Sequence, residues 1–292
     1  MVAMIAKQND AEIAIVGLGV IGGSVALRMK ERGTAVRGFS TSPRDCANAQ
    51  EAGVPVAGTL DRAVRDVGLV LIAVPLDRIA TVADEVIGAA PPRATILHAG
   101  SLQRAESLRT MPEIGARLIG THPLAGSHKS GFTGARADLF HGATVLVERR
   151  ADKQQRADAE LLWSMAGARR IEYATAGAHD DAMAWMSHLP QLASKALGAA
   201  LAGELASAPN DKPTLPLGPG ARDTTRLAMS PLEMWQPILE RAPAATLEGL
   251  RVLESNVHRL RVALEEKNWN DLRDVWESAR EWRVAAEQGE ST

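Results

Sequence analysis

The chain of 292 residues lacks the features that mark secreted, membrane-spanning or strongly charged proteins. Its one cysteine, Cys46, cannot form a disulfide within the chain, which favours a reducing compartment. No apolar run approaches the roughly 20 residues that span a bilayer. The best candidate, residues 68–76, is typical of a buried strand. Residues 1–10 lack the basic and long apolar regions of a signal peptide. We therefore expect a soluble, cytoplasmic protein.

The chain also lacks an excess of either charge. Its formal net charge is −2 at pH 7, and acidic and basic residues are interspersed rather than blocked. We therefore expect no nucleic-acid partner and no membrane partner. With 46% hydrophobic residues the chain can bury a full core, and its length fits one large domain or two modest ones.

Residues 1–174 alternate short apolar runs with longer amphipathic stretches. Apolar strands that bracket helices in this way favour a parallel sheet covered on both faces. We predict strands at residues 12–16, 35–39, 69–74, 95–98, 117–120, 144–148 and 170–173, and helices between them that include 22–32 and 153–165.

After residue 174 the pattern changes to long helical runs. We predict helices at residues 179–206, 231–267 and 270–287, with a proline-rich loop at 207–220. The expected organisation is therefore an α/β domain over residues 1–174 and an all-α domain over residues 175–292.

A glycine-rich turn joins the first predicted strand to the first helix. Gly17 permits the tight turn, Gly19 lets a pyrophosphate approach the backbone, and Gly22 allows the helix to pack closely on the sheet. We therefore predict a Rossmann-type dinucleotide-binding domain, the alternative being a glycine turn in another kind of α/β protein. The predicted cofactor contacts here are Gly17, Gly19, Val20, Ile21, Gly22, Val74 and Pro75.

The end of the second predicted strand lacks the acidic residue that usually holds the ribose of NAD. Ser40, Thr41, Ser42 and Arg44 stand there instead and offer hydroxyl groups and a guanidinium to a 2′-phosphate. We therefore predict that NADP is preferred over NAD. The alternative is that Arg44 caps a helix and that both cofactors are used.

His122 has the most informative surroundings of the histidines, because Pro123 and Gly126 follow it at the end of a predicted strand. Ligands of such folds bind at the carboxyl ends of the parallel strands. A histidine also suits removal of a hydroxyl proton while a hydride leaves the same carbon. A lone loop histidine is more often structural than catalytic, so both interpretations stay open on this ground alone.

Three segments of the chain resemble the prephenate and arogenate dehydrogenase family. Residues 122–131, His-Pro-Leu-Ala-Gly-Ser-His-Lys-Ser-Gly, match a loop that is fairly specific to that family. Residues 186–191 are similar to its Ser-His-Leu-Pro-His segment, and residues 218–228 to its Arg-Asp-x-Thr-Arg segment. The resemblance covers roughly residues 12–285.

This resemblance implies an enzyme of tyrosine biosynthesis that oxidises prephenate or arogenate, releases carbon dioxide and passes a hydride to NAD(P). His122 would accept the proton of the ring hydroxyl, with Ser101 hydrogen-bonding near it and near the nicotinamide. Arg226 would bind a substrate carboxylate through its planar guanidinium. The other implied substrate contacts are Asp223, His179, His188, Gln191 and Trp235. For His188, burial between helices is the alternative.

The chain departs from this family at two places. Gln191 stands where the family has the second histidine of its Ser-His-Leu-Pro-His segment, so the choice between prephenate and arogenate stays open. His98 and Gln103 replace an aspartate and a lysine around Ser101, which therefore lacks its familiar neighbours. We expect no metal site.

Two other classes of protein remain as alternatives. A β-hydroxyacid dehydrogenase or imine reductase that uses NADP would also join a Rossmann-type domain to helices, with a lysine such as Lys195 at its active site. A non-catalytic dinucleotide-sensing protein would need neither His122 nor Arg226. The apolar composition of the helical region favours a homodimer, and the resemblance implies the same. Its tryptophans include Trp235, Trp269, Trp276 and Trp282.

Overall fold

The computed structural model describes residues 13–109, 111–126, 129–206 and 217–290. Their contacts divide the chain into two units. The first unit holds Met1–Met183 and Ser230–Ala242, and the second holds Ala184–Met229 and Pro243–Thr292. The predicted succession of an α/β region and a helical region is confirmed, whereas the predicted boundary at residue 174 stays a prediction.

A seven-stranded sheet forms the middle of the first unit, in the order β2-β1-β3-β4-β5-β6-β7. Neighbouring strands from β2 to β5 are parallel, and all the predicted strands are present. The strands are β1 (Ile13–Val16), β2 (Val36–Phe39), β3 (Leu69–Ile72), β4 (Thr95–His98), β5 (Leu118–Pro123), β6 (Thr144–Glu148) and β7 (Arg170–Ala174).

Strand β6 differs from the prediction of a parallel sheet, because it runs antiparallel to β5. A parallel pair needs a long crossover, usually a helix, between its strands. Between β5 and β6 the described residues form only the short helix η2 (Phe132–Gly134), so the chain returns alongside β5 in the opposite direction. Strand β7 then pairs with β6 in parallel after a helix.

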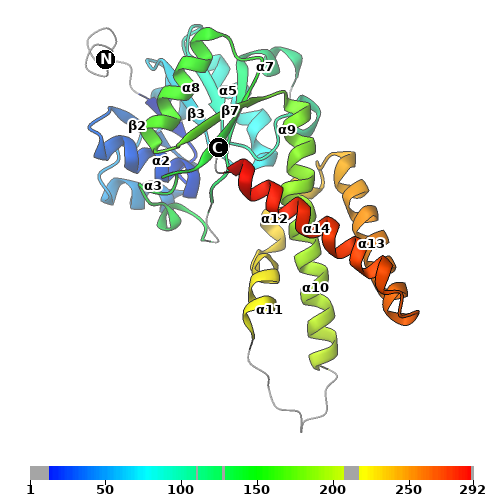
Figure 1. The fold of residues 1–292 in the computed structure, drawn as a ribbon. Helices are drawn as coiled ribbons and strands as arrows, with labels where there is room; N and C mark the ends of the chain where they lie inside the picture. Colours follow the sequence, from blue (N-terminus) through cyan, green and yellow to red (C-terminus); the bar gives the residue numbers. More distant parts are fainter. Residues whose placement is uncertain (1–12, 110, 127–128, 207–216, 291–292) are drawn as a thin grey trace. The chain divides into compact units, whose positions relative to one another are not determined.

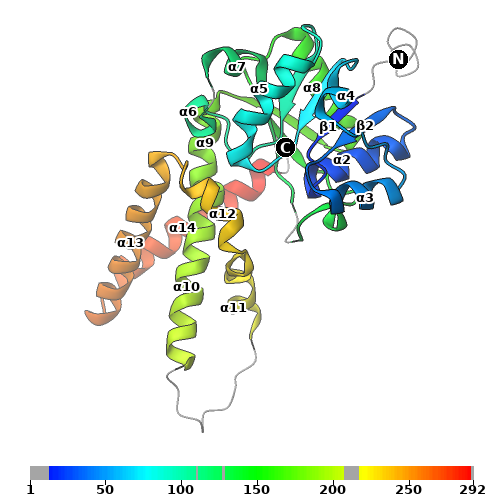
Figure 2. The ribbon, with the colours of Figure 1, turned by 180° about the vertical axis from the view of Figure 1, so that it is seen from behind.

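Helices cover both faces of this sheet, as Figures 1 and 2 show from opposite sides. The side chains of β1 alternate between the faces, with Ile15 in one apolar cluster and Ala14 in the other. The first face carries α2 (Val20–Glu31), α3 (Pro43–Glu51) and α8 (Lys153–Ala166). The second carries α4 (Leu60–Val64), η1 (Leu76–Arg78), α5 (Ile79–Ala89), α6 (Ala105–Leu108), α7 (Pro112–Arg117) and α12 (Leu232–Leu239). Helix α9 (Ala176–Met183) follows β7.

Helix α8 illustrates how local signals and burial act together. A capping box forms at its start, where Asp152 and Gln155 each bond to the other's backbone N–H at 2.9 Å. Its end is set by Gly167, which has φ +107°. Trp163 of α8 is fully buried and meets Phe140 edge to face, with ring centroids 5.2 Å apart. Burial of an aromatic side chain of this size stabilises the fold by about 2–3 kcal/mol.

The described residues of the second unit are helical, and no helix of the described chain is long and apolar enough to cross a membrane. The predicted helix at 179–206 is divided, because Pro190 lacks the N–H that would bond to the carbonyl of Met186, and a π turn forms just before it. The elements are η3 (Ala184–His188), α10 (Leu189–Ala206), α11 (Pro219–Thr224), η4 (Arg226–Met229), α13 (Ala244–Glu265) and α14 (Trp269–Glu290).

Two further predictions about the helical region need correction or fall outside the described residues. The helix predicted at 231–267 is divided into α12 and α13, because Pro243 starts α13 and cannot continue a preceding helix. Of the loop predicted at 207–220, residues 207–216 lie outside the described residues and the last part begins α11.

Substitution of Gly22 by alanine is expected to lower the free energy of unfolding by about 2 kcal/mol or more. The added Cβ would lie 1.9 Å from the carbonyl oxygen of Gly17 and 2.9 Å from Cγ2 of Ile15, so backbone would have to shift. Gly19→Ala is the matched control, since no atom of the described residues lies within 4 Å of its Cβ position, and it should cost less than about 1 kcal/mol. Urea unfolding followed by circular dichroism measures both, and equal stabilities would contradict the packing argument.

Candidate active site

The turn after β1 is shaped by glycines in two different ways. Gly17 has φ +100°, and a Cβ there would lie 2.4 Å from the carbonyl oxygen of Ala73. Its N–H donates to the carbonyl of Phe39 at 2.8 Å, which ties β1 to β2. At Gly19 no atom of the described residues lies within 4 Å of the Cβ position, and no side chain among them caps the start of α2. The backbone N–H groups at this open helix end fit the pyrophosphate of a dinucleotide.

The other predicted cofactor contacts near the turn lie at the same edge of the sheet. Val20 and Ile21 begin α2 and are half-buried. Val74 and Pro75 follow β3, the strand that pairs with β1. Cγ1 of Val74 lies 3.0 Å from the Cβ position of Gly17. The structure therefore brings these residues together where the strand order reverses, which is where open α/β sheets bind ligands.

Hydroxyl groups gather after β2, at the start of α3. Ser42 caps α3 by accepting the N–H of Asp45 at 3.2 Å, and Ser40 accepts the N–H of Ser42 at 3.2 Å. Thr41 and Arg44 are exposed. The side chain that caps α3 is therefore Ser42 and not Arg44. A guanidinium beside several hydroxyl groups is a suitable surrounding for a phosphate.

A chain of three side chains in the first unit connects β5 to α9. His122 of β5 places its Nδ1 3.0 Å from Nε2 of His179, and the two rings meet edge to face with centroids 5.1 Å apart. Nδ1 of His179 lies 2.8 Å from Oδ1 of Asp180. Both α9 side chains are fully buried, whereas His122 is half-buried. The ring nitrogens of His179 are thus engaged by protein groups, which leaves neither for the substrate contact expected of it.

Asp180 is held by the loop that follows β4. Its Oδ1 accepts the N–H of Gln103 at 2.8 Å, and its Oδ2 accepts the N–H of Arg104 at 3.0 Å. The hydroxyl of Ser107 lies 3.4 Å from Oδ2. Burial acts to raise the pKa of Asp180, but the hydrogen bonds from His179 and the two backbone N–H groups outweigh it and lower the pKa below 3.8. Asp180 is therefore ionised at neutral pH.

Asp180 is not among the site residues predicted from the sequence. A signal was present, because Asp180 directly follows His179, but the N–H groups that surround it come from residues 76 and 77 positions earlier. Ser101, predicted to act beside His122, lies half-buried in the same loop as these donors. It makes no hydrogen bond within the described residues, so its role stays a prediction.

His98 stands where the resembling family has an aspartate, at the end of β4, and it is buried. Its Nδ1 accepts the N–H of Gly100 at 3.1 Å. Burial lowers the pKa of His98 from 6.5 to about 3, with further lowering by His179 and Arg150 and an opposing effect of Asp180. His98 is therefore neutral at physiological pH, with its proton on Nε2.

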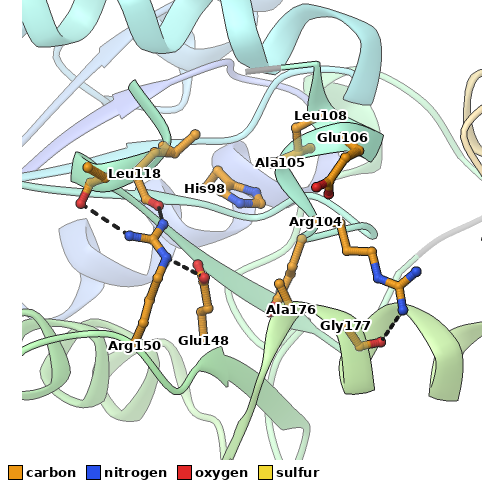
Figure 3. A pocket seen from close by; sticks show the side chains of 12 residues that line it. His98, Arg104, Ala105, Glu106, Leu108, Leu118, Glu148, Arg150, Ala176 and Gly177 are labelled. Atoms are coloured by element: carbon orange, nitrogen blue, oxygen red, sulfur yellow. Dashed lines mark hydrogen bonds and ion pairs between the residues drawn. The ribbon is translucent and has the colours of Figure 1, made fainter. Parts of the chain in front are cut away.

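A cavity of about 530 Å³ lies beside His98 in the first unit (Figure 3). Arg104 and Arg150 lie on either side of the imidazole. Arg104 donates to the carbonyl of Gly177 at 3.1 Å, and Arg150 pairs with Glu148. Both guanidinium groups are thus occupied by acceptors of the protein. No residue that lines this cavity was among the predicted site residues.

The second unit holds four of the predicted substrate contacts. His188 is buried, with Nδ1 3.0 Å from Oγ1 of Thr246, which is the position of a histidine packed between helices. Gln191 is buried and donates to a backbone carbonyl of η4 at 2.9 Å. Asp223 and Arg226 are exposed. A pocket shared by these residues and His122 stays a prediction.

Trp235 and Lys195 were also considered from the sequence. Trp235 is half-buried on α12, in the first unit. Lys195, the lysine of the alternative enzyme class, is exposed in the second unit and donates to the carbonyl of Ala228 at 2.6 Å. Within the described part of the chain, no group of three or more His, Cys, Asp and Glu residues could hold a metal ion.

Family models match both regions of the chain. The model described as prephenate dehydrogenase, nucleotide-binding domain, matches residues 25–172, and the one described as prephenate dehydrogenase, dimerization domain, matches residues 175–278. The cyclohexadienyl dehydrogenase of Zymomonas mobilis is 30% identical over 283 residues, which cover 94% of this chain and 95% of that protein.

Solved structures show the same fold. Synechocystis arogenate dehydrogenase is 26% identical, with a TM-score of 0.76, and the match covers 93% of this chain and 98% of that one. The prephenate dehydrogenase of A. aeolicus, solved with hydroxyphenyl propionate and NAD+, has a TM-score of 0.81 at 22% identity. That match covers 95% of this chain and 99% of that one.

His98→Asn is expected to make the protein less sensitive to acid. The pKa of His98 is 6.5 in the unfolded chain and about 3 in the folded protein. Between about pH 3 and pH 6.5 the unfolded chain therefore binds one more proton than the folded protein. Stability is therefore lost as the pH falls, by up to about 1.4 kcal/mol for each pH unit in that window. An asparagine Oδ1 can still accept the N–H of Gly100.

The test is to measure the free energy of unfolding in urea at pH 7.5 and at pH 5. The decrease in this free energy from pH 7.5 to pH 5 should be smaller in H98N than in the wild type by about 2 kcal/mol. The exposed His141, changed to asparagine, serves as the control. Identical pH dependence in wild type and H98N would show that His98 does not remain neutral in the folded protein.

Proposed function

Because the chain belongs to the prephenate dehydrogenase family, we propose that it oxidises prephenate, or its amino analogue arogenate, with loss of carbon dioxide and transfer of a hydride to NADP, in the biosynthesis of tyrosine in the cytoplasm. The observation that carries the proposal is the position of His122. It lies at the carboxyl end of β5 and is hydrogen-bonded through His179 to a buried carboxylate. The comparisons favour this reading over a β-hydroxyacid dehydrogenase or a dinucleotide sensor.

The substrate ring carries a hydroxyl group and, across the ring, a quaternary carbon with a carboxylate. A bound nicotinamide dinucleotide, held at the glycine turn of Gly17, Gly19 and Gly22, would supply the acceptor for the hydride from the carbon that bears the hydroxyl. His122 accepts the hydroxyl proton in the same step, which leaves a carbonyl on the ring. The carbon–carboxylate bond then breaks, and its electron pair enters the ring as carbon dioxide leaves. The ring becomes aromatic, and the phenolate oxygen can regain the proton from His122.

The protein mainly has to align the substrate, the hydride acceptor and the base, because aromatisation makes the overall reaction strongly favourable. We propose that Arg226 binds a substrate carboxylate and that Asp223 and Trp235 also contact the substrate. Ser101 would hydrogen-bond near the reacting carbon, and Gln191 would bear on the choice between prephenate and arogenate. These roles are supported by the matching sequence segments and by the exposed position of Arg226.

We propose NADP as the preferred cofactor. Ser42 rather than Arg44 caps α3, so the guanidinium of Arg44 is not needed for that purpose. Ser40 stands where a carboxylate would repel a 2′-phosphate. A cationic side chain and neighbouring hydroxyl groups supply charge-assisted hydrogen bonds to that phosphate.

We also propose that the chain forms a homodimer through its helical region. The match to a dimerization domain over residues 175–278 supports this. Large apolar side chains on the long helices of the second unit are exposed, which is unusual unless a partner covers them. They are Leu247, Val252, Val257 and Leu264 of α13, and Trp269, Trp276, Trp282 and Val284 of α14.

The purified protein should reduce NADP when prephenate or arogenate is added, as followed by the absorbance of the reduced nicotinamide. His122→Asn should lower kcat by about 10²- to 10⁴-fold, because an asparagine cannot take up the hydroxyl proton. His141→Asn, at an exposed histidine of the same unit, should leave kcat unchanged. Absence of turnover with all pairings of the two substrates and the two cofactors would refute the proposed reaction.

Arg44→Ala should lower kcat/KM for NADP by about 10- to 100-fold, which is the loss of one charge-assisted hydrogen bond, and change kcat/KM for NAD less than about twofold. Ser40→Asp should have a larger effect and give a higher kcat/KM with NAD than with NADP. A carboxylate repels the 2′-phosphate of NADP and accepts hydrogen bonds from the ribose hydroxyls of NAD. Initial rates with both cofactors measure the preference. A wild-type preference for NAD would contradict this assignment.

A further inference from the structure

We infer that Asp180, acting through His179, determines which nitrogen of His122 accepts the proton of the substrate. The inference rests on the proposed function, in which His122 is the base. Asp180 and His179 are then positioning residues: they touch His122 or each other and act on the reaction through the protonation state of that imidazole. The three side chains, here called the relay, are joined by two contacts: one of 2.8 Å between His179 and Asp180, and one of 3.0 Å between His122 and His179.

The first contact joins Asp180 to His179. Asp180 is ionised, and its two oxygens already accept the N–H groups of Gln103 and Arg104. An ionised carboxylate can only accept hydrogen bonds. Nδ1 of His179, 2.8 Å from Oδ1, must therefore carry the hydrogen. In the neutral imidazole, Nε2 of His179 is then an acceptor.

The second contact joins His179 to His122. Since Nε2 of His179 is an acceptor, Nδ1 of His122, 3.0 Å away, must be the donor. In neutral His122 the lone pair is then on Nε2, and this nitrogen can accept a proton from a hydroxyl group. With the opposite arrangement, Nε2 of His122 would carry a hydrogen and could not act as a base. Asp180 thus selects the reactive tautomer of His122 across two hydrogen bonds.

The same contacts stabilise the product of proton uptake. Once Nε2 of His122 has gained the substrate proton, the hydrogen on its Nδ1 can move to Nε2 of His179. The positive charge would then lie directly beside the carboxylate of Asp180, inside a buried ion pair. His98, which lies close enough to affect both groups, stays neutral at physiological pH because burial and His179 lower its pKa to about 3. It therefore adds no positive charge next to this pair.

Asp180 also links the acid–base group to a second part of the site. Its partners Gln103 and Arg104 belong to the loop after β4 that carries Ser101, while His179 is its neighbour on α9. Arg104 is further tied to α9, since it donates to the carbonyl of Gly177 at 3.1 Å. The relay is thus anchored on a rigid connection between α9 and this loop.

Four variants test the inference. His179→Leu and Asp180→Asn break the relay. His179→Gln is the conservative variant, because a glutamine amide can accept from Nδ1 of His122 through its oxygen and donate to Asp180 through its nitrogen. Asp181→Asn is the matched control: it makes the same change one position along, at a half-exposed carboxylate outside the relay.

If the wild-type enzyme turns over, H179L and D180N should each lower kcat by about 100-fold or more relative to it. Their KM values should change less than about threefold. H179Q should lose less than tenfold, and D181N less than twofold. If H179L and D180N both keep kcat within threefold of an active wild type, the inference fails while the proposed function stands. No wild-type turnover at all would instead be the failure of the proposed function.

A second measurement does not depend on turnover. In the ligand-free protein with ¹⁵N-labelled histidine, NMR should show the hydrogen of His122 on Nδ1, with the signals assigned by their loss in H122N. In H179L the hydrogen should no longer be held on Nδ1, since leucine offers that nitrogen no acceptor. A hydrogen on Nε2 of His122 in the wild type would overturn the inference.

Discussion

An ionised carboxylate inside a protein costs several kcal/mol unless its oxygens accept hydrogen bonds, and Asp180 satisfies this with donors from separate parts of the chain. Two backbone N–H groups come from the loop after β4, at Gln103 and Arg104. The third donor is His179, which in turn contacts His122 of β5. One buried charge therefore joins β4, β5 and α9. The orientation of the His122 imidazole therefore depends on the folding of these elements.

Two parts of the candidate site are built from different kinds of groups. The cofactor side relies on backbone: Gly17 and Gly22 leave no room for a side chain, and Gly19 leaves the helix end open. The part around His179 relies on buried polar side chains, of which Asp180 is charged and His98 is neutral. This division follows from the chemistry, since a phosphate needs several N–H donors, whereas proton transfer needs one group of suitable pKa.

Much of the fold could be predicted from the sequence, because several strands of the sheet, such as β1 and β3, are short apolar runs bounded by turn residues. The direction of β6 could not, because an apolar run has the same pattern in either direction and only the connection before it decides the pairing. The interruptions at Pro190 and Pro243 were visible as prolines. Whether a proline starts, bends or ends a helix depends on the packing around it.

The sequence by itself determined what is local: the glycine turn, the hydroxyl groups after β2, the loop around His122, and with them the family. These are contiguous patterns whose chemistry can be stated without knowing the neighbours. Only the tertiary structure decided that Asp180 holds His179 against His122 and that His98 stays neutral. Both depend on burial and on contacts between residues far apart in the chain, and no periodicity or short motif records which distant groups will meet or how much water will be left around them.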